Sequence, residues 1–247
     1  MNIQEKLIET YHSGHYDAFM PKSEDEWRWV LDRFDLNFSP YMTNLNKNNK
    51  VVDLPCGVGY LEDYLIEKGF NSLVAVDLSG EQIEVAKSVL SQRKVSYQGK
   101  VEFIIDDIFD FLSKGEKYQA IFLIDIIEHF GKEDVFKLIR YAVNSLEADG
   151  LLFIRTPNAE YPMFGRFYND LTHITPFTTT SMSQLIRACS LTEVHNGFEV
   201  VPFSSKKQLF TGKIKEVIFN AVQGLLGKFL GVKKGGFSEN IVCIAKK

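Results

Sequence analysis

The chain has 247 residues, 45% of them hydrophobic, which is enough to bury the core of a single α/β domain with modest additions. Its formal net charge of -4 argues against a nucleic-acid partner, because domains that bind nucleic acids usually carry a basic excess. The cysteines lie far apart in apolar segments and no apolar run reaches the roughly 18 residues of a bilayer span, so we expect a cytoplasmic protein without a disulfide framework, a cysteine zinc cluster or an integral membrane segment.

Residues 1–48 have helical rather than strand character, and Trp27, Trp29 and Phe34 belong to an apolar cluster set among acids and arginines. The alternating pattern of an α/β domain begins only after this segment. We therefore predict a helical cover over residues 1–48 and the main domain over residues 49–247.

The main domain opens with a strand, a glycine turn and a helix. A short apolar strand ends at Asp53, Gly57 and Gly59 follow, and residues 61–68 carry apolar side chains at helical spacing. Glycines let a ligand approach the main chain closely, and the N-terminus of the new helix presents free amides. The turn is therefore suited to hold a nucleoside cofactor.

A second apolar run, residues 73–76, ends on Asp77, about 20 residues after the glycines. The carboxyl ends of parallel strands open on one edge of a sheet, and a carboxylate there can accept hydrogen bonds from ribose hydroxyls. Asp53, Gly57, Gly59 and Asp77 together resemble the first two motifs of class I S-adenosylmethionine-dependent methyltransferases.

That resemblance implies an α/β, Rossmann-like class I methyltransferase fold with a seven-stranded, mostly parallel sheet and helices on both faces. It also implies S-adenosylmethionine as the cofactor. Pro55 stands where most such enzymes have glycine. The cofactor-binding residues that the resemblance implies are Asp53, Pro55, Gly57, Gly59, Asp77, Leu78, Asp107, Ile108 and Ile124.

The adenine site is expected after the third predicted strand, residues 101–105. In the family, an acid there accepts a hydrogen bond from the exocyclic amine, and the next apolar side chain packs on the adenine ring. Asp107 and Ile108 match these positions, and Asp106 is the alternative acid.

The fourth predicted strand, residues 120–124, leads into Asp125, Glu128 and His129, which would share one face of a helix. Three interpretations stay open. These side chains can hydrogen-bond loop backbone, His129 can act as a general base on an acceptor hydroxyl, or the group can bind a divalent metal.

The metal interpretation rests on a resemblance to the acid-x-x-Glu-His motif of ubiquinone-pathway O-methyltransferases and small-RNA 2′-O-methyltransferases. The small-RNA enzymes add a histidine from a later loop, for which His173 is the candidate. Oxygen and imidazole ligands suit Mg²⁺, Mn²⁺, Fe²⁺ or Zn²⁺. The implied metal ligands are Asp125, Glu128, His129 and His173, and the candidate catalytic residues are His129 and His173.

Residues 155–177 form a loop too long for a simple connection. Its Asp-Leu-Thr-His run at residues 170–173, followed by Pro-Phe-Thr, closely resembles bacterial methyltransferases of surface-polysaccharide and other glycan pathways. In that group the loop lines the acceptor pocket, and an N-terminal helical segment helps to shape it. A guanidinium such as that of Arg155 could grip a phosphate, because it is a planar two-pronged donor. The implied substrate-binding residues are Tyr11, Arg155, Asn158 and Tyr168.

Residues 203–237 form a predicted helical insertion before the last strand, which the family places antiparallel between its neighbours. Within the insertion, residues 211–230 carry a continuous apolar stripe with lysines elsewhere. The stripe can pack on its own domain or on a second subunit of a homodimer. The alternative is a lid or a contact with a membrane surface.

Together these patterns predict an S-adenosylmethionine-dependent O-methyltransferase. Its acceptor would be a small phosphorylated or nucleotide-linked precursor in capsule or surface-polysaccharide biosynthesis, and a divalent metal would assist transfer if the metal interpretation holds. The alternative is a domain that binds the cofactor without transferring methyl groups, as a regulatory or partner subunit.

Overall fold

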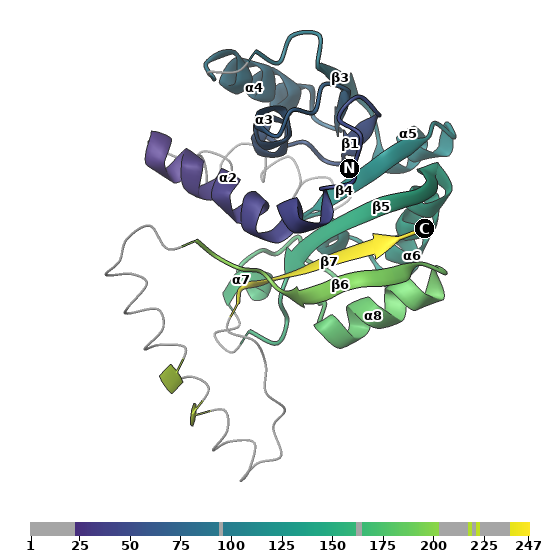
Figure 1. The fold of residues 1–247 in the computed structure, drawn as a ribbon. Helices are drawn as coiled ribbons and strands as arrows, with labels where there is room; N and C mark the ends of the chain where they lie inside the picture. The colour runs from purple at the N-terminus through teal and green to yellow at the C-terminus, as the bar shows by residue number, and fades with distance from the viewer. Residues whose placement is uncertain (1–22, 94–95, 162–164, 203–216, 219–220, 223–237) are drawn as a thin grey trace.

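The structure is a computed structural model that describes residues 23–93, 96–161, 165–202, 217–218, 221–222 and 238–247. Helices and strands alternate along most of the described chain (Figure 1). In chain order the elements are α2 (Glu24–Phe38), η1 (Ser39–Tyr41), β1 (Val51–Asp53), α3 (Tyr60–Glu67), β2 (Leu73–Asp77), α4 (Gly80–Ser91), β3 (Val101–Ile105), α5 (Ile108–Ser113), β4 (Tyr118–Ile124), η2 (Ile127–His129), α6 (Lys132–Ser145), β5 (Leu146–Pro157), α7 (Gly165–Tyr168), α8 (Thr179–Ala188), β6 (Thr192–Phe198) and β7 (Asn240–Lys246).

The strands form one seven-stranded sheet in the order β3-β2-β1-β4-β5-β7-β6. β1 pairs in parallel with β2 and β4, and parallel pairing continues outward to β3 and β5. β7 inserts antiparallel between β5 and β6. The predicted seven-stranded, mostly parallel sheet is therefore confirmed, including its antiparallel last strand.

Helices cover both faces of the sheet because alternate residues of a strand point to opposite sides. On β4, Ile121 and Leu123 belong to the core formed with α5, α6 and α8, whereas Ala120 and Phe122 belong to the core formed with α2 and α3. Figure 1 shows α2 and α3 on one side of the sheet and α6 and α8 on the other. The prediction of helices on both faces is confirmed.

Helix α2 is the described part of the predicted N-terminal cover. Its residues Trp27, Leu31, Phe34 and Phe38 are buried in the core, and the side chain of Ser23 caps its first turn. Trp27 Nε1 also donates a hydrogen bond of 2.7 Å to Asp63 Oδ2 on α3. This part of the cover is therefore built into the core, and the division at residue 48 stays a prediction.

The predicted insertion over residues 203–237 lies mostly outside the described residues. Of its apolar stripe, the structure places Val217, Ile218, Ala221 and Val222, and all four side chains are exposed. No helix in the described ranges combines the length and the apolar character that crossing a bilayer requires.

Candidate active site

The glycine turn (residues 54–59) connects β1 to α3 at the carboxyl edge of the parallel strands. Gly57 and Gly59 have φ angles of 52° and 86°, a conformation that other residues rarely adopt. A Cβ on Gly59 would also lie 3.3 Å from the Leu90 side chain and 3.4 Å from Cβ of Ala86, both on α4. Gly59 is therefore required both by its backbone angle and by close helix packing.

Asp77 ties this turn to the end of β2. Its Oδ2 accepts a hydrogen bond from the Gly57 amide (3.1 Å), and its Oδ1 accepts one from the Ser79 amide (2.9 Å). Its neighbour Leu78 is 60% exposed and offers an apolar surface beside the turn. The structure thus brings the predicted cofactor residues of β1 and β2 together at one edge of the sheet.

The predicted adenine acid, Asp107, caps helix α5. Its Oδ1 accepts hydrogen bonds from the amides of Phe109 (2.8 Å) and Asp110 (3.2 Å). The alternative acid, Asp106, forms an ion pair with Lys114, while its amide donates to the Asp77 carbonyl at 3.1 Å. Asp107 and Ile108 therefore follow the strand end beside Asp77, and their contact with adenine stays a prediction.

Glu128, His129 and His173 form a cluster at the end of β4, which we call the acid-histidine cluster. One potential ligand atom from each of the three lies within 4.8 Å of the others. The amides of Ile174 and Thr175 donate to the Glu128 carbonyl at 2.7 and 3.0 Å, so backbone hydrogen bonds bring the later loop onto the strand end.

Asp125 stands apart from this cluster, which corrects the expectation that it shares a helical face with Glu128 and His129. The chain forms a short 3-10 helix over Ile127–His129 instead of an α-helix, and Asp125 has a left-handed φ of 51°. Both Asp125 carboxylate oxygens bind the guanidinium of Arg155, with Nε and Oδ1 3.0 Å apart. Its predicted role as a metal ligand is therefore not supported by its contacts.

Two further predicted substrate residues have internal partners. Arg155 is 9% exposed and, besides Asp125, lies 3.6 Å from the Glu199 carboxylate. Asn158 Nδ2 donates to the Ser238 carbonyl at 2.9 Å, and its Oδ1 accepts from the Glu160 amide at 2.9 Å. These hydrogen bonds hold the strand end together, so the proposed grip of Arg155 on a phosphate is not favoured.

The other two predicted substrate residues are Tyr168, which follows a residue that contacts His173, and Tyr11. Tyr168 on α7 is 68% exposed, and its ring packs edge-on against Phe167. Tyr11 lies outside the described residues. Their roles as acceptor-binding residues stay predictions.

Hydrogen bonds orient the two histidines. His129 Nδ1 lies 2.9 Å from the Thr172 hydroxyl, and His173 Nδ1 lies 2.9 Å from the Phe167 carbonyl oxygen. Because a carbonyl only accepts, the proton of His173 is on Nδ1, and Nε2 faces the carboxylates of Glu128 (3.9 Å) and Asp170 (3.8 Å). The lone pair of Nε2 and the carboxylates repel one another, so a cation or a proton between them would stabilise this arrangement.

The burial of the cluster changes its proton affinities. Burial, followed by the charge of Asp125, raises the pKa of Glu128 to about 8. Burial, followed by the neighbouring His173, lowers the pKa of His129 to about 4, so its imidazole is neutral at pH 7. Glu128 Oε2 accepts from the Thr156 hydroxyl at 2.9 Å, whereas Oε1 has no hydrogen-bond partner among the described residues. A neutral imidazole and an unsatisfied carboxyl oxygen suit proton transfer or a cation.

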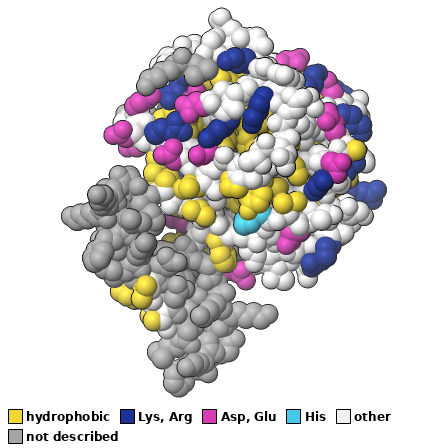
Figure 2. Space-filling view, in the orientation of Figure 1, with side chains coloured by type: hydrophobic (Ala, Val, Ile, Leu, Met, Phe, Trp, Pro, Cys, Tyr) yellow, Lys and Arg dark blue, Asp and Glu magenta, His cyan; other side chains and the backbone are white. Residues whose placement is uncertain are grey.

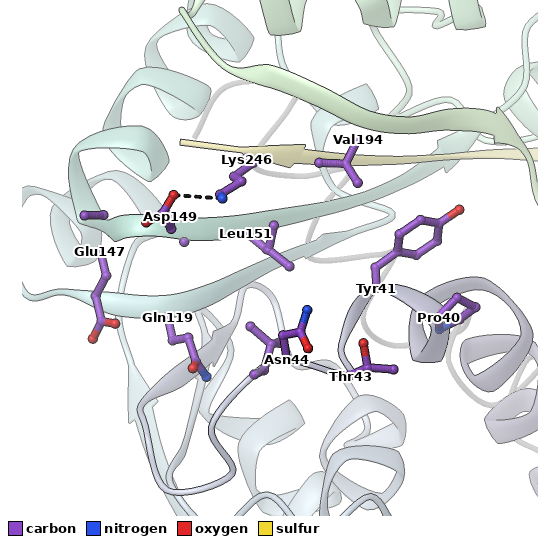
Figure 3. Close-up of a pocket in the computed structure, with 13 residues that line it drawn as sticks. Pro40, Tyr41, Thr43, Asn44, Gln119, Glu147, Asp149, Leu151, Val194 and Lys246 are labelled. Carbon is purple, nitrogen blue, oxygen red and sulfur yellow. Dashed lines mark ion pairs between the residues drawn. The ribbon is translucent and has the colours of Figure 1, made fainter.

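A pocket of about 480 Å³ lies at the opposite end of the sheet (Figure 3). It is lined by residues 147–151 of β5, by Gln119 of β4, by Tyr41, and by the ion pair of Asp149 with Lys246 at 2.7 Å. None of the predicted site residues in the described part of the chain lines it. The carboxyl edge, and not this pocket, therefore holds the residues that carry the expected chemistry.

Comparison with known proteins agrees with the fold. A family model described as a methyltransferase domain matches residues 20–196. Among solved structures, a SAM-dependent methyltransferase from Archaeoglobus fulgidus is 18% identical with a TM-score of 0.64, covering 90% of this chain and 94% of that one. The 1,6-didemethyltoxoflavin-N1-methyltransferase of Burkholderia thailandensis is 15% identical with a TM-score of 0.62, covering 99% and 87%. The chain belongs to the class I S-adenosylmethionine-dependent methyltransferases.

The curated relatives match a shorter part of the chain than the solved structures do. The chain is 29% identical over 136 residues to the ubiquinone biosynthesis O-methyltransferase of Bartonella bacilliformis, which is 55% of this chain and 50% of that protein. It is 26% identical over 141 residues to the Bacillus subtilis methyltransferase YqeM, and the match covers 56% of this chain and 50% of that protein. The chain thus spans about half the length of the curated relatives it matches.

The residues present at the turn fit the family cofactor. S-Adenosylmethionine carries an ammonium and a sulfonium, and the buried carboxyls of Asp53 and Glu62 include oxygens without a hydrogen-bond partner in the described part of the chain. Glu62 was not among the predicted site residues, because no motif singles it out. Glu199 and Thr156 were missed for the same reason, whereas Thr172 lies inside the Asp-Leu-Thr-His run.

Proposed function

We propose that the chain transfers the methyl group of S-adenosylmethionine to a hydroxyl oxygen of a small acceptor. The observation that carries this proposal is His129, a partly buried and neutral imidazole held by Thr172 at the carboxyl edge that also holds the glycine turn. When bound, the cofactor supplies a methyl group already activated by its sulfonium. The protein then has to orient the acceptor and accept one proton.

Oxygen is the preferred acceptor atom for two reasons. A hydroxyl must lose its proton on methylation, and the His129 imidazole is unprotonated at pH 7 and so has the capacity to accept a proton. The relative from Bartonella bacilliformis is also named as an O-methyltransferase. His129 would be the general base, with Thr172 orienting its ring and His173 packed edge-on at 4.7 Å between ring centroids.

Divalent-metal assistance is a refinement of the same proposal. Glu128, His129 and His173 are the residues that would hold the ion, and the Nε2 atom of His173 facing two carboxylates supports it. A bound cation would lower the pKa of the acceptor hydroxyl. We expect excess chelator to abolish transfer and to leave cofactor binding unchanged; full activity in chelator would leave His129 as the base without a metal.

The acceptor class comes from the resemblance of residues 170–178 to glycan-pathway methyltransferases. We propose a phosphorylated or nucleotide-linked glycan precursor of capsule or surface-polysaccharide biosynthesis, in which Arg155 does not bind the phosphate because it already pairs with two carboxylates. On the face shown in Figure 2, basic and acidic side chains are interspersed, which suits a small acceptor better than a polyanion.

The test is a transfer assay with methyl-labelled S-adenosylmethionine and host-cell extract, separated into small-molecule and macromolecular fractions. Label in a small anionic fraction supports the proposal. Cofactor binding without any transfer favours the alternative of a non-catalytic regulatory or partner subunit. A cytoplasmic location is proposed with the same function.

A contact of the stripe at residues 211–230 with a second subunit or a membrane surface stays a proposal. Exposure of the described residues Val217, Ile218 and Val222 supports it. Sedimentation with anionic vesicles and light scattering of the protein alone separate the two forms of contact.

A further inference from the structure

Asp53 and Glu62 form a buried pair of acids directly beneath the glycine turn. Asp53 ends β1 and is 4% exposed, and Glu62 lies in the first turn of α3 and is 1% exposed. Asp53 Oδ1 and both carboxyl oxygens of Glu62 lack a hydrogen-bond partner among the described residues. The two carboxyls are close enough to share a proton with each other.

No described lysine, arginine or histidine forms an ion pair with either acid. The next residue, Asp63, differs because its carboxylate has partners. Its Oδ2 accepts hydrogen bonds from Trp27 and Arg93, each of 2.7 Å. Two buried carboxylates without a cation repel each other and lose hydration, so one of them keeps its proton.

The described titratable groups beside the pair supply no compensating positive charge. The Asp77 carboxylate at the end of β2 adds negative charge, and the Cys56 thiol in the turn is uncharged because burial raises its pKa far above neutrality. Burial raises the pKa of Glu62 to about 8, and burial followed by the charge of Glu62 raises the pKa of Asp53 well above its usual value. At pH 7 the pair therefore holds one proton.

The cofactor supplies the missing positive charge, since its methionine part is expected at this turn and carries an ammonium beside the sulfonium. We propose that Asp53 and Glu62 share one proton in the cofactor-free protein and that binding of S-adenosylmethionine at the glycine turn releases this proton to solvent. The ammonium of the cofactor takes the place of the shared proton. The positive charge beside the two carboxyls is therefore kept when the proton leaves.

The coupling fixes the direction of the pH dependence. Below about pH 8 the pair is protonated in the free protein, so binding must displace the proton, and the cofactor affinity rises with pH by up to about tenfold per unit. Above that pH the pair is already ionised and the affinity levels off. A site without the coupling would show no such slope below the titration of the cofactor itself.

Isothermal titration calorimetry of the full chain in buffers of different ionisation enthalpy measures the protons released per S-adenosylmethionine bound. The titration is done near pH 6.5, because the cofactor's α-amino group, with a pKa of roughly 7.7–8.0, then stays protonated. We expect close to one proton released by the wild type and close to none by Glu62→Gln. Glu67→Gln removes a partly exposed acid of the same helix and should release as many protons as the wild type.

The wild-type measurement decides the proposal by itself, even if a variant does not fold. Tight binding without proton release overturns it, and so does unchanged release by both Glu62→Gln and Asp53→Asn. The result is also separate from the proposed acceptor chemistry, because calorimetry measures cofactor binding and needs no methyl acceptor. Proton release without any methyl transfer would therefore support this inference while the proposed function fails.

Discussion

The glycine turn and the acid-histidine cluster lie at the same edge of the sheet, but they are built in different ways. The turn is local: Gly57, Gly59 and Asp77 come from one strand-turn-helix-strand unit and are joined by short-range packing. The cluster joins η2 to a loop more than 40 residues later through hydrogen bonds from Ile174 and Thr175 to Glu128. A local unit tolerates distant changes, whereas the cluster depends on contacts from several elements.

The largest expected effect concerns the cluster. His129→Ala should lower methyl transfer by about 10²–10⁴-fold, because the proton acceptor is lost, while cofactor affinity stays unchanged. Initial rates with labelled cofactor and calorimetric binding measure the two quantities. The control His195→Ala removes a half-buried histidine that stacks on Tyr41 and is expected to keep full transfer activity. Equal losses in both variants would contradict the assignment.

The next effect is on the stability of the ion pairs beside the cluster. Arg155→Met removes a buried guanidinium that pairs with Asp125 and Glu199, of which Glu199 keeps its ion pair with Arg33, and should lower the free energy of unfolding by about 3–5 kcal/mol. Urea denaturation measures this loss. Arg28→Met breaks exposed ion pairs with Asp32 and Glu67 and should cost less than about 1 kcal/mol. A similar cost for both variants would mean that the Arg155 pair is not structurally important.

A smaller effect is expected at the turn. Gly59→Ala combines a left-handed backbone with a close contact to Leu90 and should destabilise by about 1–3 kcal/mol and weaken cofactor binding. Gly69→Ala is the matched control, because Gly69 has a similar φ of 89° but nothing within 4 Å of the added Cβ. The Gly69→Ala variant should lose only the free energy of unfolding that the left-handed backbone costs an alanine, and should bind the cofactor normally. Equal binding defects would show that the turn packing is irrelevant.

The last expected effect is a pH-dependent change in melting temperature. The folded-state pKa of Glu62, about 8, lies above its unfolded value, so the wild type loses stability as pH rises from about 4.5 to 8. Glu62→Gln removes this loss. The melting temperature of the variant relative to wild type should therefore increase between pH 5 and 8.5, and a difference independent of pH would contradict a shared proton.

Much of the fold could be predicted from the chain alone. The apolar runs ending at Asp53, Asp77 and Ile124 became strands because their periodicity and punctuation are local properties. The helix expected from Asp125 did not form, because this residue has a left-handed φ and its carboxylate pairs with Arg155. Arg155 lies on β5, 30 residues further along the chain, so this pairing could not be predicted from the local sequence. The helical stripe at residues 211–230 could be recognised in the sequence, but only four of its residues lie in the described part of the chain.

The sequence by itself determined which apolar runs of the first half become strands, the glycine turn and the types of residue at the carboxyl edge, since each of these follows from spacing along the chain. Only the tertiary structure decided how the polar side chains are paired. It joined Arg155 to Asp125 and Glu199, turned Asn158 to the Ser238 carbonyl, and left Asp53 and Glu62 facing each other. The reason is physical: burial and partner distance set the protonation and availability of a side chain, and neither is encoded in its neighbours along the sequence.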